Sequence, residues 1–211
     1  MESKSISFGS SIRFVNRDVY KMLEKKNFID YRHDRPNILK ADTFFSEEIR
    51  TCTGGGLVNP EIEALGFHFW DDLTNQKKFS YLMNCLFRFV KQPQNGLIVG
   101  SKNLKQSPLS IEQFQKIKKV FSERIKNLSI FEEHTFPNSE TNYHYSLKND
   151  TWTLCAQFQD RKDMYYKSVT NLERLQNFYR HISISDGDRL FIGDKEILPA
   201  DAPEIFKSSI R

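Results

Sequence analysis

The sequence predicts an α/β fold, with α+β as the alternative, in which a mixed β-sheet sandwich is flanked by helices and followed by a C-terminal helix and β-hairpin. Three observations predict it. Two long segments carry apolar residues at helical spacing, strand-length apolar runs alternate with them, and turn motifs separate the runs. With 211 residues, 38% of them apolar and 18 of them Phe, the chain is long enough to bury a substantial core.

Residues 1–43 are expected to form an N-terminal extension. The start is polar, and residues 15–26 place Val19, Met22 and Leu23 at the spacing of a short surface helix. Residues 31–36 are charged and end in a proline, which is typical of a loop, and residues 37–45 show no clear period and are expected to be irregular.

Residues 44–160 are expected to form the core. Residues 48–53 run extended into three glycines, and residues 65–70 are an apolar and aromatic run of strand length. A helix is predicted over residues 79–90 and a buried strand over residues 97–100.

A second long helix is predicted from a capping box at Ser110 and Gln113 to Leu128. Strands are expected over residues 128–136, 142–147 and 151–158, and a turn at residues 148–150 joins the last two.

Residues 161–211 are expected to pack on the same domain. Thr170 and Glu173 predict the start of a helix that carries Leu172, Leu175 and Phe178. A final hairpin over residues 189–198 is expected to turn at Gly193 and Asp194.

Composition excludes several classes of function. The net charge of +4 is spread thinly along the chain, which does not indicate a nucleic-acid partner. Three cysteines without a C-x-x-C spacing argue against a disulfide framework or a zinc site. No apolar run is long enough for a membrane span or a signal peptide, so we expect a cytoplasmic protein, or an effector that is secreted by a route without such a signal.

The segment around Cys52 is the strongest candidate for chemistry. Cys52 precedes Thr53 and a run of three glycines, and His68 follows on the next predicted strand. A thiol becomes a nucleophile when a base takes its proton, and histidine is the usual base. The backbone N–H groups of Thr53, Gly54 and Gly55 are the expected donors to an oxyanion, because glycine lets the backbone approach closely.

The other two cysteines and a second histidine are weaker candidates for these roles. Cys85 and Cys155 also have a histidine nearby in the sequence, but both stand among apolar residues and are expected to be small buried hydrophobes. His68 alternates with Phe67 and Phe69, which would leave it free to face a cleft, and His144 is the reserve candidate for the base.

Two further motifs near this segment are expected to be structural. The glycine run lacks the lysine of a phosphate-binding loop. Asp71 and Asp72 are more typical of a helix N-terminus than of a metal site, so no metal and no cofactor is expected.

The arrangement resembles the CheD-type deamidase superfamily, which includes chemoreceptor glutamine deamidases, the catalytic domains of cytotoxic necrotising factor-like toxins and N-terminal asparagine amidohydrolases. In that superfamily a nucleophilic cysteine is followed on the next strand by a histidine, and a threonine often lies six positions before the cysteine. Here Cys52 is followed by Thr53, His68 lies 16 positions further on, and Ser46 lies six positions before Cys52. The resemblance covers residues 44–160. Serine replaces threonine, and the glycines follow the cysteine instead of small residues preceding it.

The resemblance implies a protein-glutamine deamidase without a cofactor, in which Cys52, His68 and Ser46 are catalytic. It also implies a protein substrate, which for a bacterial effector or toxin would be a host protein. Transglutamination, peptide hydrolysis and N-terminal amide hydrolysis use the same chemistry and stay open, as does a non-enzymatic interaction module.

Overall fold

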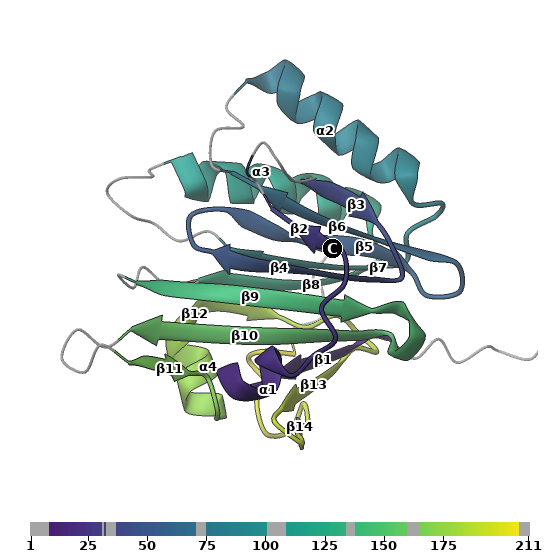
Figure 1. The fold of residues 1–211 in the computed structure, drawn as a ribbon. Coiled ribbons are helices and arrows are strands. Elements are labelled where there is room, and N and C mark those ends of the chain that lie inside the picture. Colours follow the sequence, from purple (N-terminus) through teal and green to yellow (C-terminus); the bar gives the residue numbers. More distant parts are fainter. Residues whose placement is uncertain are drawn as a thin grey trace, which may run out of the picture.

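The computed structural model describes residues 9–30, 32, 37–70, 75–100, 109–133, 138–159 and 165–206. Two β-sheets are stacked face to face, and two long helices cover the outer face of one of them (Figure 1). The predicted combination of mixed sheets and helices is therefore confirmed.

Sheet B lies beneath the two long helices and has six strands among the described residues. Its order is β12 (Tyr179–Ser183), β8 (Asn127–Glu133), β7 (Asn95–Gly100), β5 (Thr53–Asn59), β6 (Glu63–Phe69) and β3 (Ile38–Lys40). Only β7 and β8 are parallel, because a helix connects them; the other described pairs are antiparallel.

Sheet A forms the second layer and has eight strands among the described residues. Its order is β14 (Lys195–Ile197), β13 (Arg189–Ile192), β1 (Ser11–Phe14), β10 (Thr151–Gln159), β9 (Ser139–Ser146), β4 (Thr43–Ile49) and β2 (Phe28–Ile29), with β11 (Tyr166–Ser168) paired to β10. A short 3-10 helix, η1 (Leu147–Asn149), turns the chain from β9 into β10.

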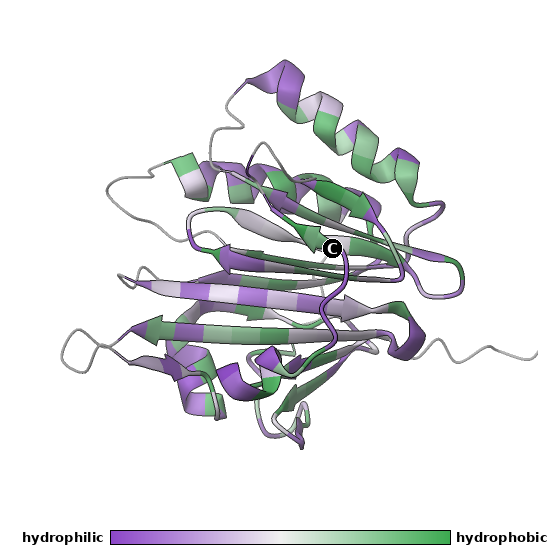
Figure 2. Ribbon diagram, in the orientation of Figure 1, coloured by the Kyte–Doolittle hydropathy of each residue, from purple (hydrophilic) through white to green (hydrophobic). Residues whose placement is uncertain are grey.

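Helices α2 (Gln76–Phe89) and α3 (Leu109–Arg124) pack apolar side chains against sheet B. Hydrophilic and hydrophobic residues alternate along both helices (Figure 2), as expected for helices with one face on a sheet. The shorter helices α1 (Arg17–Lys21) and α4 (Leu172–Phe178) lie on the side of sheet A (Figure 1).

Bulky side chains of sheet A pack directly onto glycines of sheet B. A Cβ at Gly66 would lie 2.5 Å from the Phe44 ring, and one at Gly56 would lie 2.9 Å from the Trp152 ring. Gly54 likewise leaves room for Tyr143, whose Cε1 would lie 2.8 Å from an added Cβ. Because these positions have no side chain, the two sheets approach closely enough for the aromatic rings to fill the space between them.

Several predicted elements are confirmed with shifted ends. They are the two long helices, the strands now seen as β6, β7, β8, β9 and β10, and the final hairpin of β13 and β14. The cap of α4 is Asn171 rather than Thr170, and Ser110 lies inside α3 rather than at its cap.

The prediction of a separate N-terminal extension is wrong for its described part. Strand β1 lies inside sheet A and pairs in parallel with β10 and β13. Residues 37–45, expected to be irregular, contribute β3 and the start of β4. Short strands such as these depend on partners far away in the sequence, which local periodicity does not reveal.

The expected loop at residues 31–36 lies outside the described residues except for Arg32, and so do Asp71 and Asp72. Within the described ranges, the helices are too short or too polar to cross a membrane.

The packing of Phe44 on Gly66 predicts the effect of adding one methyl group. Gly66→Ala should lower the free energy of unfolding by about 1–3 kcal/mol, because the methyl group overlaps Phe44 and Ile29. Urea denaturation measures this value.

Gly96→Ala is the matched control, since the nearest atom to its added Cβ would be 3.3 Å away. It should lower the free energy of unfolding by less than half as much as Gly66→Ala. Equal losses in both variants would contradict the proposed role of Gly66, and Phe44→Leu should restore part of the stability of Gly66→Ala.

Candidate functional site

The candidate site lies where the chain passes from one sheet to the other. Strand β4 of sheet A ends at Ile49 and β5 of sheet B begins at Thr53, so residues 50–52 cross between the sheets. Near the end of β4, Ser46 pairs with Tyr143 of β9 and Ile49 pairs with Thr141. β4 therefore has one more residue than β9 between these two pairs, which is a β-bulge. The extra residue turns both Ser46 and Ile49 toward the interior, where both are fully buried.

His68 lies on β6 opposite Gly54 of β5. Its neighbours Phe67 and Phe69 pack against the helices, so the imidazole points the other way, toward sheet A. There its Nδ1 is 2.8 Å from the Ser46 Oγ. Ser46 and His68 therefore join the two sheets through side chains.

The hydrogen bonds around Ser46 fix the tautomer of His68. The Ser46 hydroxyl donates its proton to the backbone carbonyl of Ile29 at 2.6 Å. A hydroxyl has one proton, so it accepts from His68, and Nδ1 carries the hydrogen. In the neutral ring the lone pair is then on Nε2, which is the atom that would take a proton from a thiol.

Cys52 belongs to the same interior face. It packs in the core between the sheets, together with Ile49 and Tyr143. It stands two positions before Gly54, the residue that pairs with His68. Cys52 and His68 are thus brought to one end of the sandwich on one face of sheet B.

The expectation of an open cleft at this pair is wrong for the conformation described. Cys52 is 2% exposed, and His68 and Ser46 are fully buried. The physical reason is the close approach of the sheets at the glycines, since Ile49 and Tyr143 occupy the space over Gly54. Alternation along β6 correctly predicted which face His68 is on, but that face is covered by the second sheet.

Burial lowers the pKa of His68 from 6.5 to about 4. The nearby Asp30 carboxylate opposes this shift and Arg32 reinforces it. Asp30 is itself buried and paired with Arg32. The imidazole is therefore neutral at pH 7, which is the form that accepts a proton.

The three predicted oxyanion donors do not point toward Cys52. Thr53, Gly54 and Gly55 pair on one side with β6 and on the other with β7, so their backbone groups belong to the ladders of a central strand. Gly55 has a φ of +146°, and a Cβ there would lie 2.0 Å from the carbonyl oxygen of Leu97. The glycines thus serve strand geometry and sheet packing.

The side chain of Thr53 also does not face Cys52. Its Oγ1 is buried and has no hydrogen-bond partner within the described ranges. It pairs with Phe69, however, and so lies on the helix side of sheet B, away from the face of Cys52.

Of the other two cysteines, Cys155 is the small buried hydrophobe that was expected, whereas the same expectation for Cys85 is wrong. Cys155 is fully buried on the outer face of sheet A with Tyr20 and Val15, and burial raises the pKa of its thiol to about 12. The environment of Cys155 therefore disfavours a thiolate. Cys85 is half-buried on α2.

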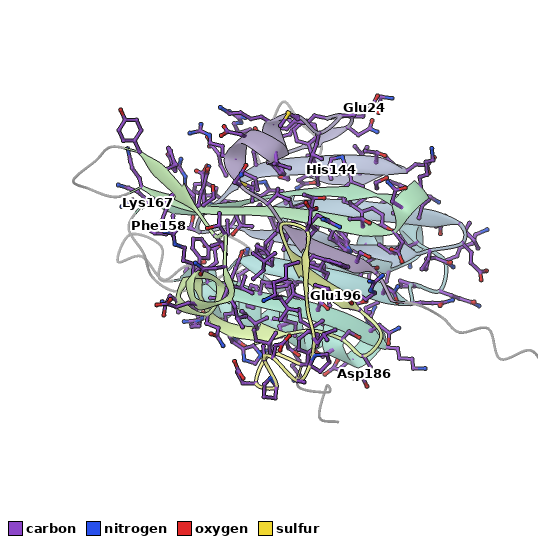
Figure 3. The ribbon with its side chains drawn as sticks, turned by 90° about the horizontal axis from the view of Figure 1, so that it is seen from below. Glu24, His144, Phe158, Lys167, Asp186 and Glu196 are labelled. Atoms are coloured by element: carbon purple, nitrogen blue, oxygen red, sulfur yellow. The ribbon has the colours of Figure 1, made fainter. Side chains whose placement is uncertain are left out.

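His144, the reserve base, lies on the outer face of sheet A. Its Nε2 is 3.2 Å from the carbonyl oxygen of Glu24, and Figure 3 shows these two residues close together. Sheet A therefore separates His144 from the interior face that holds Cys52.

Tyr143 is a neighbour of the site that the sequence analysis missed. Its hydroxyl donates to the backbone carbonyl of Phe67 at 2.6 Å, and its ring lies against Gly54. It ties sheet A to the strand that carries His68. Alternation along residues 142–147 is the signal that could have placed it in the core, but its partner was not predictable.

The buried neutral His68 predicts a pH dependence of stability. The unfolded chain binds a proton at His68 near pH 6.5, and the folded protein only near pH 4. His68 should therefore lower the free energy of unfolding as the pH falls from about 6.5 to 4, by up to roughly 3 kcal/mol.

The measurement is the difference in unfolding free energy between wild type and His68→Gln across this range. His181→Gln is the control for the loss of an exposed histidine as such. A difference between wild type and His68→Gln that does not vary with pH would contradict the low pKa of His68.

The described residues hold no cluster of three or more His, Cys, Asp or Glu side chains that could bind a metal ion. In comparisons with known proteins, no family model matches this chain. No curated protein matches it either.

Proposed function

We propose that the protein is a cysteine-dependent deamidase that converts a glutamine of a partner protein to glutamate. The observation that supports it most is the hydrogen bond between Ser46 and His68, which orients a neutral imidazole with its lone pair on Nε2. A nucleophile, a base and a group that orients the base are the parts that thiol catalysis requires. Cys52, His68 and Ser46 would supply them in that order.

In the proposed reaction the Cys52 sulfur attacks the carboxamide carbon of glutamine, and its proton passes to the Nε2 of His68. The imidazolium then protonates the departing nitrogen, which leaves as ammonia, and a thioester remains. His68 next takes a proton from water, whose oxygen attacks the thioester. Glutamate and the free thiol result. General acid–base catalysis of this kind is worth about 10² to 10⁴-fold in rate.

Burial of the site has a consequence for this mechanism. A glutamine side chain reaches the sulfur only when the residues around Cys52 separate, because Cys52 is 2% exposed. We therefore expect little activity on free glutamine and higher activity on a protein that binds and opens this end of the sandwich. Donors to the oxyanion would be set in place by the same movement, since the backbone groups of Gly54 and Gly55 are occupied.

The setting we propose is the cytosol, and for a bacterial effector it is the cytosol of the host. The resemblance to toxin domains favours this setting. An acidic partner would suit the net charge of +4.

A non-enzymatic interaction protein is the second candidate function. The burial of Cys52 and His68 favours it, because both then act as ordinary core residues. Transglutaminase, peptidase and N-terminal amidase activities share the chemistry of the first candidate and differ in the product.

Deamidation predicts a mass change that depends on Cys52. Incubated with a cell lysate, the wild-type protein should convert glutamines of a small set of proteins to glutamate, each heavier by about 1 Da. Cys52→Ser should abolish the change, and Ser46→Ala should reduce its rate by about 10² to 10⁴-fold, because His68 loses its orienting partner. Peptide mass spectrometry measures both.

Ser46→Thr keeps the hydroxyl and should retain most of the activity, which separates orientation of His68 from simple packing. Loss of activity in Ser46→Thr together with an unchanged fold would contradict the proposed role of Ser46. Absence of any conversion by the wild-type protein in lysates of bacterial and host cells would favour the interaction protein.

Thiol labelling provides a test that needs no knowledge of the substrate. In the free protein, where access decides, iodoacetamide should modify the half-buried Cys85 before Cys52 and Cys155. In the presence of lysate proteins that open this end of the sandwich, an activated thiol predicts faster labelling of Cys52 at neutral pH, and slower labelling in His68→Gln. Labelling of Cys52 that is no faster with lysate than without it would oppose the deamidase proposal.

A further inference from the structure

A cavity of about 330 Å³ lies at the end of the sandwich opposite to Cys52. The carbonyl oxygen of Cys52 lies next to Gly100, the last residue of β7. Asn95, the first residue of β7, donates to the Ser10 hydroxyl, and the backbone N–H of Ser10 donates to Asp188 of the cavity. The connection between β12 and β13, strand β14 and residues that follow it line the cavity. Figure 3 shows two of the lining residues, Asp186 and Glu196, on the same side of the molecule.

Asp188 forms the buried part of the lining. It is 8% exposed, and its Oδ1 accepts a hydrogen bond from the backbone N–H of Ser10 at 2.8 Å. Its Oδ2 accepts from the Ser129 hydroxyl at 2.6 Å. Both oxygens are thus held by neighbouring elements, and each keeps a second lone pair for another donor.

Ser185 supplies an unsatisfied hydroxyl beside this carboxyl group. The residue is 4% exposed and lines the cavity. Its backbone N–H donates to Ser129 Oγ at 3.0 Å, but within the described ranges its own Oγ has no hydrogen-bond partner. A buried hydroxyl without a partner destabilises the folded protein, so a ligand that hydrogen-bonds to it would remove that cost.

The charges around the cavity favour a cation. Arg189 is the one basic residue of the described lining, and Glu196 holds it through two hydrogen bonds of 2.9 and 2.7 Å. Within the described lining, Asp186 and Asp188 then have no basic residue paired with them. Phe206 adds an aromatic wall, on which an ammonium group or a short methylene chain packs well.

We propose that this cavity binds a small primary ammonium compound of the diamine class. The ammonium group would donate to Asp188 and Ser185, and its methylene chain would lie against Phe206. The volume falls at the lower end of the range of about 300–1,000 Å³ that is typical of small-molecule sites. This site shares no residue with the proposed deamidase site.

The test is a calorimetric titration of the full-length protein with putrescine. The uncharged 1,4-butanediol has the same shape and should bind about tenfold more weakly or not at all. Asp188→Asn and Ser185→Ala should each weaken putrescine binding, the first by about tenfold. Asp194→Asn removes an acidic group outside the cavity and should leave the affinity within about twofold.

The affinity should also depend on pH, because an ammonium group binds the ionised carboxyl group. Burial raises the pKa of Asp188 to about 7, with Asp150 adding to the shift. The other charged groups that line the cavity with Asp188 are Asp186, Arg189 and Glu196, and the ion pair of the last two raises the pKa of Arg189 and lowers the pKa of Glu196. Putrescine should therefore bind about tenfold more weakly at pH 6 than at pH 8, and this dependence should be absent in Asp188→Asn.

Equal binding of putrescine and 1,4-butanediol, no binding of putrescine at millimolar concentration, or unchanged affinity in folded Asp188→Asn would each overturn the proposal. If circular dichroism shows that Asp188→Asn does not fold, Ser185→Ala and the diol comparison decide the question, because neither alters the hydrogen bonds to Asp188. Deamidase activity is measured separately, so failure of one proposal is distinguishable from failure of the other.

Discussion

The packing of sheet A onto the glycines of sheet B is the contact on which the rest of this structure depends. Gly54, Gly56 and Gly66 remove side chains from one face, and the rings of Tyr143, Trp152 and Phe44 take their place. The distance between the sheets follows from this contact. It is short enough for the Ser46 hydroxyl of one sheet to reach the imidazole of His68 on the other, and for the same reason water is excluded from both.

The sequence predicted the elements that local patterns determine. In the two long helices, apolar residues recur at helical spacing over several turns, which predicts a helix from the local sequence alone. In the last hairpin, the residues of the turn are recognisable by type. Strand β1 was missed because its partners, β10 and β13, lie more than a hundred residues away, and because its four residues, in which polar and apolar side chains alternate, are too few to predict a strand on their own. The glycines were assigned to catalysis because a residue without a side chain gives no sign of what packs on it.

The candidate site was predicted in part for similar reasons. Residue type and position singled out Cys52 and His68, the resemblance to the deamidase superfamily added Ser46, and the structure brings Ser46 and His68 into contact. Their burial was not predictable, because it depends on rings from strands β4, β9 and β10. The Asp188 network is still less visible in the sequence, since its partners Ser10 and Ser129 come from separate parts of the chain.

The β-bulge near the end of β4 has a consequence for the evolution of this protein. Side chains of a regular strand alternate, so Ser46 and Ile49 would face opposite sides of sheet A without the extra residue between them. Loss of one residue here would expel either the hydroxyl that holds the imidazole or the methyl groups that fill the space over Gly54. Selection should therefore keep the number of residues between Ser46 and Ile49 constant. Homologous chains are expected to conserve this number more strictly than the identity of the residues.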